Sequence, residues 1–351
     1  MNRYDMAIVG LGPAGSTLAR LLGEAGRLSV CAIDAKALDG SLPSFQKPCG
    51  GLLAPDAQKT LSGFLLNLPR EILATPQIFS VRAVDLPTGL TRRYQRFYLN
   101  MDRHRFDLWL CSLIPASVRQ IDRARVTRLE RVADGFVLQV RHDGRDEPIF
   151  AARVVGADGA NSLVRRSLGA PPIRQYLSIQ QWFRAGESTP EYLALFDERI
   201  TDCYAWCDVK DGYRILGAAL PKHGCREKFE QLKAVLAARG LLDDAPPLKT
   251  EACLVSRLSS PAQLVLGCGD LFLVGEAAGF VSPSSLEGIS GAMESARALA
   301  AALCCADPQR AYRRGTRALR ARLALKLLKC PFLYLPALRR LVMKSGLAAI
   351  D

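Results

Sequence analysis

The chain has 351 residues, 49% of them hydrophobic, which allows two domains or one large interleaved domain with an ample core. The net charge is +13, but no apolar run reaches the roughly 18 residues of a membrane span, and we expect neither a span nor a signal peptide. Eleven cysteines without a C-x-x-C pair and only three histidines argue against a zinc site or a disulfide framework and favour reduced thiols.

The first 34 residues predict a nucleotide-binding βαβ unit. A strand over 4–9 leads into Gly10-Leu11-Gly12-Pro13-Ala14-Gly15, a helix is expected over 16–26, and a strand over 28–33 ends at Asp34. The first glycine permits the tight turn, the second lets the backbone approach a pyrophosphate, and the third lets the helix pack on the strand. The helix N-terminus stabilises phosphates, and the acid can bind ribose hydroxyls. The motif alone does not choose between FAD and NAD.

The rest of the chain alternates strands and helices in an α/β pattern. After a loop over 35–44, Lys47-Pro48-Cys49-Gly50-Gly51 predicts a sharp turn that brings the backbone close to another group. Helices are expected over 54–75, from Arg103, from Ser162, over 226–239 and over 287–303. Strands are expected over 78–81, 93–99, 152–155, 179–184, 204–209, 213–220 and 271–274, with a hairpin over 126–140.

Two acids follow buried strands that are far apart in the sequence. Asp158 comes after the strand over 152–155 and Glu276 after the strand over 271–274, each within glycine and small residues. An acid in this position lies at the carboxyl edge of a parallel sheet, where open α/β folds bind ligands. Together with the βαβ unit over residues 4–34, the two segments that carry these acids are predicted to line one cofactor site.

These motifs and two others give the chain, over about residues 4–305, a resemblance to flavoproteins of the p-hydroxybenzoate hydroxylase fold group, and most of all to the geranylgeranyl reductase family. The matching runs are Arg103-x-x-Phe106-Asp107, Gly156-Ala157-Asp158-Gly159, and Gly275-Glu276-Ala277-Ala278-Gly279 followed by Pro283 and Glu287-Gly288-Ile289. The turn from Lys47 to Gly51 resembles the cysteine–glycine turn of the reductases. In that family the turn lies beside the flavin and the substrate chamber, and it separates reductases from hydroxylases.

The resemblance implies an α/β fold, α+β overall, in which a Rossmann-like FAD-binding domain with a parallel sheet is interleaved with an antiparallel-sheet substrate domain. The expected bounds are 1–75, 101–170 and 263–305 for the FAD-binding domain, 76–100 and 171–262 for the substrate domain, and 306–351 for a basic helical tail. The implied cofactor-binding residues are Gly10, Gly12, Pro13, Ala14, Gly15, Asp34, Cys49, Gly50, Gly51, Arg103, Val126, Asp158, Glu276, Pro283, Gly288 and Ile289. No metal-binding residues are expected.

Two departures from the family pattern concern the flavin and the substrate. Glu276 stands where the family usually has aspartate, which places the carboxylate one methylene further out. The family's Y-x-W-x-F-P segment appears as Tyr204-Ala205-Trp206-Cys207-Asp208-Val209, which keeps the tyrosine and the tryptophan only. Because this segment lines the substrate side in the family, Lys47, Tyr204 and Trp206 are the expected substrate contacts.

Reduction of an isolated carbon–carbon double bond requires a hydride at one carbon and a proton at the other. The candidate proton donors are Cys49, Tyr204 and Glu287, since a thiol or a phenol is a plausible neutral donor. The alternatives are that Cys49 contacts the cofactor or only packs in its turn, and that Tyr204 and Trp206 are core aromatics. The helix from about Glu287 would aim its N-terminus at the flavin N1–C2 edge, or would only pack through small residues. No second glycine-rich nucleotide unit is present, so NAD(P)H would dock transiently, and ferredoxin or a quinol is an equally open donor.

The positive charge is concentrated near the C-terminus. Residues 310–344 contain eleven lysines and arginines and no acid, so the rest of the chain is nearly neutral. Pro308 marks a helix start, Pro331 and Pro336 are expected to break the helix, and one face carries Tyr312, Leu319, Leu323 and Leu327. Basic residues beside an apolar face suit anionic lipid headgroups. A solvated helix docked on the body and a nucleic-acid contact are the alternatives, and the latter lacks an aromatic platform.

The sequence therefore predicts an FAD-dependent oxidoreductase that reduces carbon–carbon double bonds of a lipid-like or isoprenoid substrate. The alternative is an NAD(P)H-dependent flavin monooxygenase that tailors a small molecule, because both reactions use this fold. A non-enzymatic flavin-binding or membrane-adaptor role is a third class. We expect a cytoplasmic monomer with peripheral contact to the inner membrane face through residues 310–344 and no nucleic-acid partner.

Overall fold

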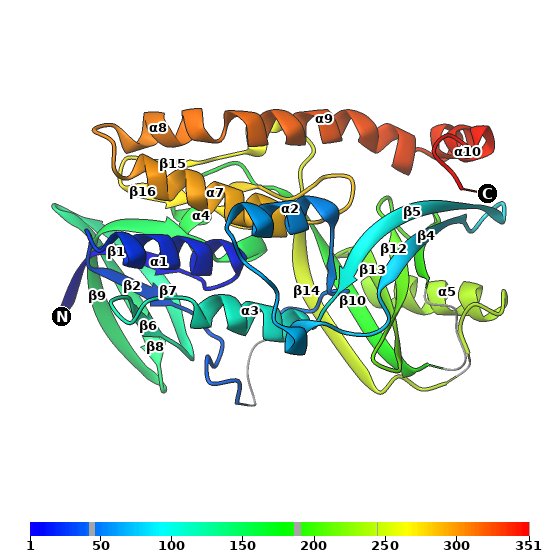
Figure 1. Ribbon diagram of the computed structural model, residues 1–351, viewed down its shortest axis with the longest axis horizontal. Helices are drawn as coiled ribbons and strands as arrows, with labels where there is room; N and C mark the ends of the chain where they lie inside the picture. The colour runs from blue at the N-terminus through cyan, green and yellow to red at the C-terminus, as the bar shows by residue number, and fades with distance from the viewer. Residues whose placement is uncertain (42–45, 186–190, 244, 351) are drawn as a thin grey trace. The chain divides into compact units, whose positions relative to one another are not determined.

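The computed structural model describes residues 1–41, 46–185, 191–243 and 245–350 (Figure 1). The chain divides by its contacts into two compact units. Unit 1 comprises Met1–Gln46, His104–Arg174 and Ser256–Leu327, and unit 2 comprises Lys47–Arg103, Gln175–Val255 and Leu328–Asp351. Residues 47–75, which the sequence analysis assigned to the FAD-binding domain, therefore group with unit 2. The loop expected over 35–44 falls partly outside the described residues.

Unit 1 is built on a sheet in which parallel pairs dominate, with the strand order β15-β16-β9-β1-β2-β6 and a hairpin of β7 and β8 beside β9. Its strands are β1 (Asn2–Val9), β2 (Val30–Ile33), β6 (Arg119–Ile121), β7 (Ala124–Val132), β8 (Gly135–His142), β9 (Arg145–Gly156), β15 (Gly267–Cys268) and β16 (Leu271–Leu273). The central strands are buried on both faces, as parallel strands in α/β folds are. Met6 and Ile8 of β1 and Val155 of β9 are fully buried.

The helices of unit 1 cover this sheet. They are α1 (Pro13–Ala25), α3 (Arg103–Ser112), α4 (Leu163–Ser167), α6 (Gly275–Ala278), α7 (Ile289–Ala302) and α8 (Pro308–Gly315), with 3-10 turns η2 (Gly159–Asn161) and η3 (Pro261–Gln263). α1 and α7 lie side by side (Figure 1). Leu18 of α1 and Leu299 of α7 belong to the same core cluster and are fully buried. Each such side chain contributes about 1.5–3 kcal/mol through burial.

Unit 2 contains a mostly antiparallel sheet with the order β14-β10-β13-β12-β11-β4-β5-β3. Its strands are β3 (Leu52–Leu53), β4 (Ile78–Asp85), β5 (Leu90–Asn100), β10 (Arg174–Arg184), β11 (Tyr192–Phe196), β12 (Ala205–Lys210), β13 (Tyr213–Pro221) and β14 (Lys249–Arg257). One face of the sheet packs on α5 (Cys225–Ala237) through an apolar cluster that includes Cys207, Leu216, Phe229 and Leu232. Since side chains alternate along a strand, Trp206 and Asp208 lie on the opposite face.

The other helices of unit 2 are α2 (Pro55–Gly63), the 3-10 turn η1 (Arg70–Ile72) and α10 (Pro336–Ser345). α9 (Arg317–Tyr334) begins in unit 1 and ends in unit 2. The fold confirms the predicted class, with a parallel-rich sheet in unit 1, a mostly antiparallel sheet in unit 2 and C-terminal helices. Among the described residues, no helix has the length and apolar character needed to cross a membrane.

Two helix predictions were wrong. The helix expected over 54–75 ends at Gly63, because Leu65 has a positive φ of 55° and the residue before Pro69 is biased away from helical geometry. Pro331 was expected to break the tail helix, but it lies inside α9. Its carbonyl accepts from Leu335 N at 2.9 Å, so the helix continues past the missing N–H. β14 was not among the strands expected from the sequence.

The apolar face predicted for the tail is confirmed in unit 1. Tyr312 is fully buried and its hydroxyl donates to Leu273 O at 2.8 Å. Leu319 and Leu323 belong to the same core as β1 and α1, and Leu327 packs against it. The part of the tail that belongs to unit 1, up to Leu327, therefore packs on the unit 1 core through this face.

Candidate flavin-binding site and substrate-side surface

The turn after β1 has the geometry that a pyrophosphate site requires. Gly10 has a φ of +98°, and a Cβ there would lie 2.6 Å from Ala157 O. A Cβ on Gly15 would lie 1.8 Å from Gly10 O, so only glycine permits this approach of α1 to the turn. A Cβ on Gly12 would meet no described atom within 4 Å. Protein atoms therefore crowd the turn at Gly10 and Gly15 but leave space at Gly12, which is the N-cap residue of α1. The free N–H groups at this helix N-terminus can bind an anion.

Asp34, at the end of β2, fixes this turn. Its Oδ2 accepts from Leu11 N at 2.5 Å, and its Oδ1 accepts from Lys36 N at 2.7 Å. Lys36 is only 4% exposed, and its Nζ lies 3.5 Å from Asp34 Oδ2 and 3.8 Å from Asp107 Oδ2. The burial of Lys36 could not be predicted from the sequence, because a lysine two residues after an acid is most often exposed. The buried charges hold Asp34 in place beside the glycine turn.

The three segments predicted to line the cofactor site, which follow β1, β9 and β16, lie together in the structure. β9 pairs with β1 through Val9 and Gly156 and with β16 through Gly156 and Leu273, so the turns that follow these strands share one sheet edge. Within this edge, a Cβ on Gly159 would lie 3.8 Å from Glu276 Oε2. Glu276 Oε1 accepts from Ser256 N at 2.8 Å, which fixes the longer side chain that stands in place of the family's aspartate.

One carboxylate oxygen of Asp158 has no hydrogen-bond partner among the described residues. Asp158 Oδ2 accepts from Leu163 N at 2.7 Å at the start of α4. Its Oδ1 is buried without a hydrogen-bond partner among the described residues, and burial raises the pKa of Asp158. Buried polar atoms in native proteins are bonded in nearly all cases, so this oxygen indicates a further donor such as a hydroxyl of a bound cofactor.

No side chain in the described part of the chain caps the N-terminus of α7, as a flavin contact there would require. Gly288 is the N-cap residue and provides no side-chain hydrogen bond, and Ile289 begins the helix. Glu287 is held in its own loop, where Oε2 accepts from Ser285 Oγ at 3.0 Å. A Cβ on Gly291 would lie 2.6 Å from Phe280 O, so α7 also packs closely through its small residues. The helix-packing role and an open N-terminus therefore coexist.

Of the other predicted cofactor residues, Pro13 and Ala14 form the buried first turn of α1. Val126 lies on β7 in the core, and the Pro283 carbonyl accepts from Arg257 Nε at 3.2 Å. Arg103 is the first residue of α3. The space at Gly12, the unbonded oxygen of Asp158 and the two bare helix N-termini fit a dinucleotide with hydroxyl and phosphate groups.

In unit 2 the turn from Lys47 to Gly51 packs against β12. Gly51 has a φ of +67°, and a Cβ there would lie 2.2 Å from Lys210 Nζ and from Met101 O. Lys210 Nζ donates to Met101 O at 2.5 Å, and burial lowers the pKa of Lys210. Cys49 Sγ accepts from Gly51 N at 3.4 Å and is partly exposed. The half-buried Lys47 begins this turn.

The predicted substrate residues Tyr204 and Trp206 lie on the same side of the sheet as this turn. The Tyr204 ring lies 5.8 Å from the Trp206 ring and 6.4 Å from the Phe196 ring, measured between centroids. Tyr98 and Tyr192 form a second pair at 6.0 Å. Gly50 faces Trp206 and Asp208, since a Cβ there would lie 3.5 Å from Trp206 Nε1 and 3.4 Å from Asp208 Oδ2. The cysteine–glycine turn and the Tyr-x-Trp segment therefore meet within unit 2.

The fold and the glycine–acid site define a flavoprotein enzyme of the FAD-dependent oxidoreductase and monooxygenase group, and comparison with known proteins agrees. The FAD binding domain family matches residues 116–314. Protein CbrA of Escherichia coli O6:H1 is 47% identical over 354 residues, covering all of this chain and 95% of that protein. Protein CbrA of Shigella sonnei is also 47% identical and is covered to 99%. The chain belongs to the FAD binding domain family, which resolves the choice between FAD and NAD in favour of FAD.

Solved structures with the same fold include proteins of different reaction types. A geranylgeranyl bacteriochlorophyll reductase-like protein from Thermoplasma acidophilum superposes with a TM-score of 0.79 at 20% identity, over 94% of this chain and 86% of that chain. PqsL of Pseudomonas aeruginosa, described as a probable FAD-dependent monooxygenase, gives 0.71 at 19% identity, over 98% and 99% of the two chains. At these identities the likeness concerns the fold.

Proposed function

We propose that this protein reduces carbon–carbon double bonds of a lipid-like or isoprenoid substrate. The observation that carries the proposal is the packing of the Lys47–Gly51 turn against Trp206 and Asp208. This turn resembles the motif that separates reductases from hydroxylases, and here it lies on the face of the sheet that carries Tyr204 and Trp206. A reductase-like protein and a monooxygenase share the fold, so the fold alone does not choose between the two reactions.

FAD, when bound, supplies the hydride for this reaction. The glycine turn and Asp34 would hold its adenosine end, and Asp158 and Glu276 its hydroxyl groups. Cys49 and Tyr204 are the proposed proton donors, because both lie on the face of the unit 2 sheet that carries Trp206 and because a thiol and a phenol can each transfer a proton. Glu287, bonded to Ser285, would position the loop before α7. We propose NAD(P)H as the electron donor, docked transiently.

The test is a single turnover without oxygen. FAD on the purified protein is reduced anaerobically, an isoprenoid alkene such as geranylgeraniol is added, and the return of the oxidised flavin spectrum is followed. Reoxidation with formation of a saturated product is the expected result. Reoxidation that requires oxygen and yields an oxygenated product would favour the monooxygenase instead, and flavin that no donor reduces would favour a non-enzymatic role.

We also propose that the C-terminal helices contact an anionic membrane surface. Large apolar side chains on α9 and after it are more than half exposed, namely Leu325, Leu328, Phe332, Leu335, Leu341, Leu347 and Ile350. Residues 310–344 carry eleven lysines and arginines and no acid. Of these, Arg322, Arg339 and Arg340 form ion pairs with acids outside the segment. Exposed apolar side chains among cations suit lipid headgroups, and a lipid substrate would be met there.

A further inference from the structure

Four buried polar atoms on one face of the unit 2 sheet have no hydrogen-bond partner among the described residues. They are both carboxyl oxygens of Asp208, Nε1 of Trp206 and Oε1 of Gln180. Asp208 is 0% exposed, Gln180 is 1% exposed and Trp206 is 8% exposed. Such atoms are rare in native structures and indicate a water, an ion or a ligand that is to be bound.

The four atoms are neighbours by strand register. Gly217 of β13 pairs with Trp206 of β12 on one side and with Gln180 of β10 on the other, so all three residues lie in one row. Asp208 follows Trp206 by two residues and points to the same face. A Cβ on Gly217 would lie 2.3 Å from Trp206 Cε2 and 2.6 Å from Nε1. The indole ring therefore crosses over Gly217, which brings its N–H toward Gln180.

Gly50 leaves space for a small group beside Asp208 and Trp206. A Cβ on Gly50 would lie 3.4 Å from Asp208 Oδ2, 3.5 Å from Trp206 Nε1 and 3.8 Å from Trp206 Cδ1. These are ordinary van der Waals distances, so a group of methyl size fits there without displacing a neighbour. One small polar group near this point would reach both the carboxyl and the indole N–H.

The chemistry of these atoms selects a hydroxyl group. Trp206 Nε1 can only donate, so it requires an acceptor, whereas an ionised Asp208 requires a donor. A hydroxyl is both. Burial raises the pKa of Asp208 to about 7, with the Lys210 ammonium opposing the rise, so the carboxyl is also available as a donor near neutral pH. Because Lys210 already lies beside the carboxylate, a cationic ligand is not required. The neighbouring Tyr204 ring offers an apolar surface for the rest of such a ligand.

We propose that Asp208, Trp206 and Gln180 form a subsite that binds a hydroxyl group of the substrate. The subsite extends the proposed function. It rests on that proposal for one point, namely that the rest of the ligand is apolar. It uses the position at which this chain departs from the Y-x-W-x-F-P pattern, because Asp208 stands where that pattern has phenylalanine. The substrate class is then an apolar molecule with a hydroxyl group, such as an isoprenoid alcohol.

A pair of substitutions tests the subsite without knowledge of the substrate. Gly50→Ala places a methyl group in the space, and Gly50→Ser places a hydroxyl group there that can bond to Asp208 and Trp206. In the FAD-loaded protein we expect a higher Tm for Gly50→Ser than for Gly50→Ala. Equal Tm values for the two variants would overturn the subsite, since the buried polar atoms would then not respond to a hydroxyl.

A ligand comparison tests the same subsite by affinity. Geranylgeraniol and its methyl ether are titrated into the oxidised FAD-loaded protein, and binding is followed by the flavin absorbance. We expect at least about tenfold tighter binding of the alcohol than of the ether by the wild type. For Trp206→Phe and Asp208→Leu, which remove the hydrogen-bonding atoms, we expect the two affinities to be nearly equal. Asp243→Asn, which alters an exposed acid of unit 2, should keep the wild-type ratio. A ratio near one in the wild type would overturn the subsite and leave water as the occupant. If neither compound binds, the lipid-like substrate is refuted, and the Ser/Ala comparison still decides the subsite.

Discussion

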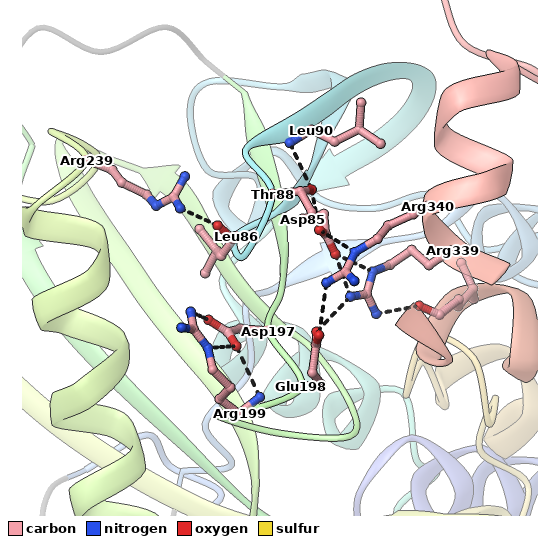
Figure 2. A network of polar contacts seen from close by, with 11 residues as sticks. Asp85, Leu86, Thr88, Leu90, Asp197, Glu198, Arg199, Arg239, Arg339 and Arg340 are labelled. Atoms are coloured by element: carbon pink, nitrogen blue, oxygen red, sulfur yellow. Dashed lines mark hydrogen bonds and ion pairs between the residues drawn. The ribbon is translucent and has the colours of Figure 1, made fainter. Parts of the chain in front are cut away.

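Arg339 of α10 donates from Nε and Nη2 to Asp85 Oδ1 at the end of β4, at 3.0 and 2.5 Å (Figure 2). Arg340 donates to the other oxygen at 2.9 Å, and Glu198 accepts from both arginines. Asp85 is 0% exposed and Arg339 4% exposed. Burial raises the pKa of Asp85, but the bonds from Thr88 and the arginines outweigh it and lower the pKa overall. Two of the tail cations therefore fix α10 within unit 2.

Asp85→Ala should destabilise the protein by about 3–5 kcal/mol, because it leaves the buried Arg339 without its main partner. Urea unfolding measures the loss. The matched control is Asp146→Ala, which removes an exposed ion pair with Arg141 and should cost at most about 1 kcal/mol. Because the Asp85 pKa is lowered in the folded state, its contribution should be lost as the pH falls below about 4. Equal costs for the two variants would contradict the prediction.

Gly12→Ala should weaken FAD binding at least about tenfold, or about 1.4 kcal/mol, while leaving the stability of the apoprotein nearly unchanged. The reason is that a Cβ at this position meets no described protein atom but would occupy the side from which a pyrophosphate approaches. Gly15→Ala is the contrasting variant and should destabilise the apoprotein as well, since its Cβ would clash with Gly10 O. FAD titration and apoprotein melting measure the two effects. Unchanged FAD affinity in Gly12→Ala would place the pyrophosphate elsewhere.

Cys49→Ser should retain FAD but slow reoxidation of the reduced flavin by the alkene, by about 10²-fold if the thiol supplies the proton. The measurement is the anaerobic single turnover, with the FAD content of each preparation determined first. Cys268→Ser, an exposed cysteine of unit 1, is the control and should behave as the wild type. Full activity in Cys49→Ser would leave Cys49 as a packing residue of its turn.

Leu328→Glu combined with Phe332→Glu should abolish sedimentation with anionic vesicles, because both apolar side chains are exposed on α9 and each substitution adds a negative charge. Leu248→Glu, at an exposed apolar position outside the tail, is the control. Removing residues 308–351 would be a poorer test, since Tyr312 and Leu323 belong to the core. Binding of the wild type should weaken as salt rises beyond the physiological range, where the Debye length is about 8 Å. No wild-type binding at low salt would refute the membrane contact.

The stability of the wild type should fall as the pH rises from about 4 to about 7, because Asp208 takes up its proton more readily in the folded state, where its pKa is about 7, than in the unfolded chain. The slope from this group is at most about 1.4 kcal/mol per pH unit, and Asp208→Asn should remove it. The titratable groups that interact with Asp208 include Lys210, with its pKa lowered by burial, and Tyr192 and Cys207, with their pKa values raised by burial. None of the three gives a slope of this sign between pH 4 and 7. Parallel stability–pH curves for wild type and Asp208→Asn would exclude a raised pKa at Asp208.

The sequence by itself determined the nucleotide-binding unit and the class of protein. The roles of Gly10, Gly12 and Gly15 depend on a strand, a turn and a helix that are adjacent in the chain, so their spacing is sufficient to predict them. Asp158 and Glu276 could be placed at the sheet edge for a similar reason, because an acid directly after a buried parallel strand has only one edge to occupy. Local pattern also identified the buried face of Tyr312 and Leu319.

Only the tertiary structure decided which distant residues meet. Asp85 and Arg339 are 254 positions apart, and nothing in either neighbourhood indicates the other. The same holds for the pairing of Lys36 with Asp107 and for the contact of Gly50 with Asp208. Contacts between residues distant in the chain depend on how sheets and helices pack against one another, and local periodicity does not encode that packing. Asp208 appeared in the sequence only as a departure from a family pattern. Its burial without a partner, and hence its chemistry, follows from the strands and the turn that surround it.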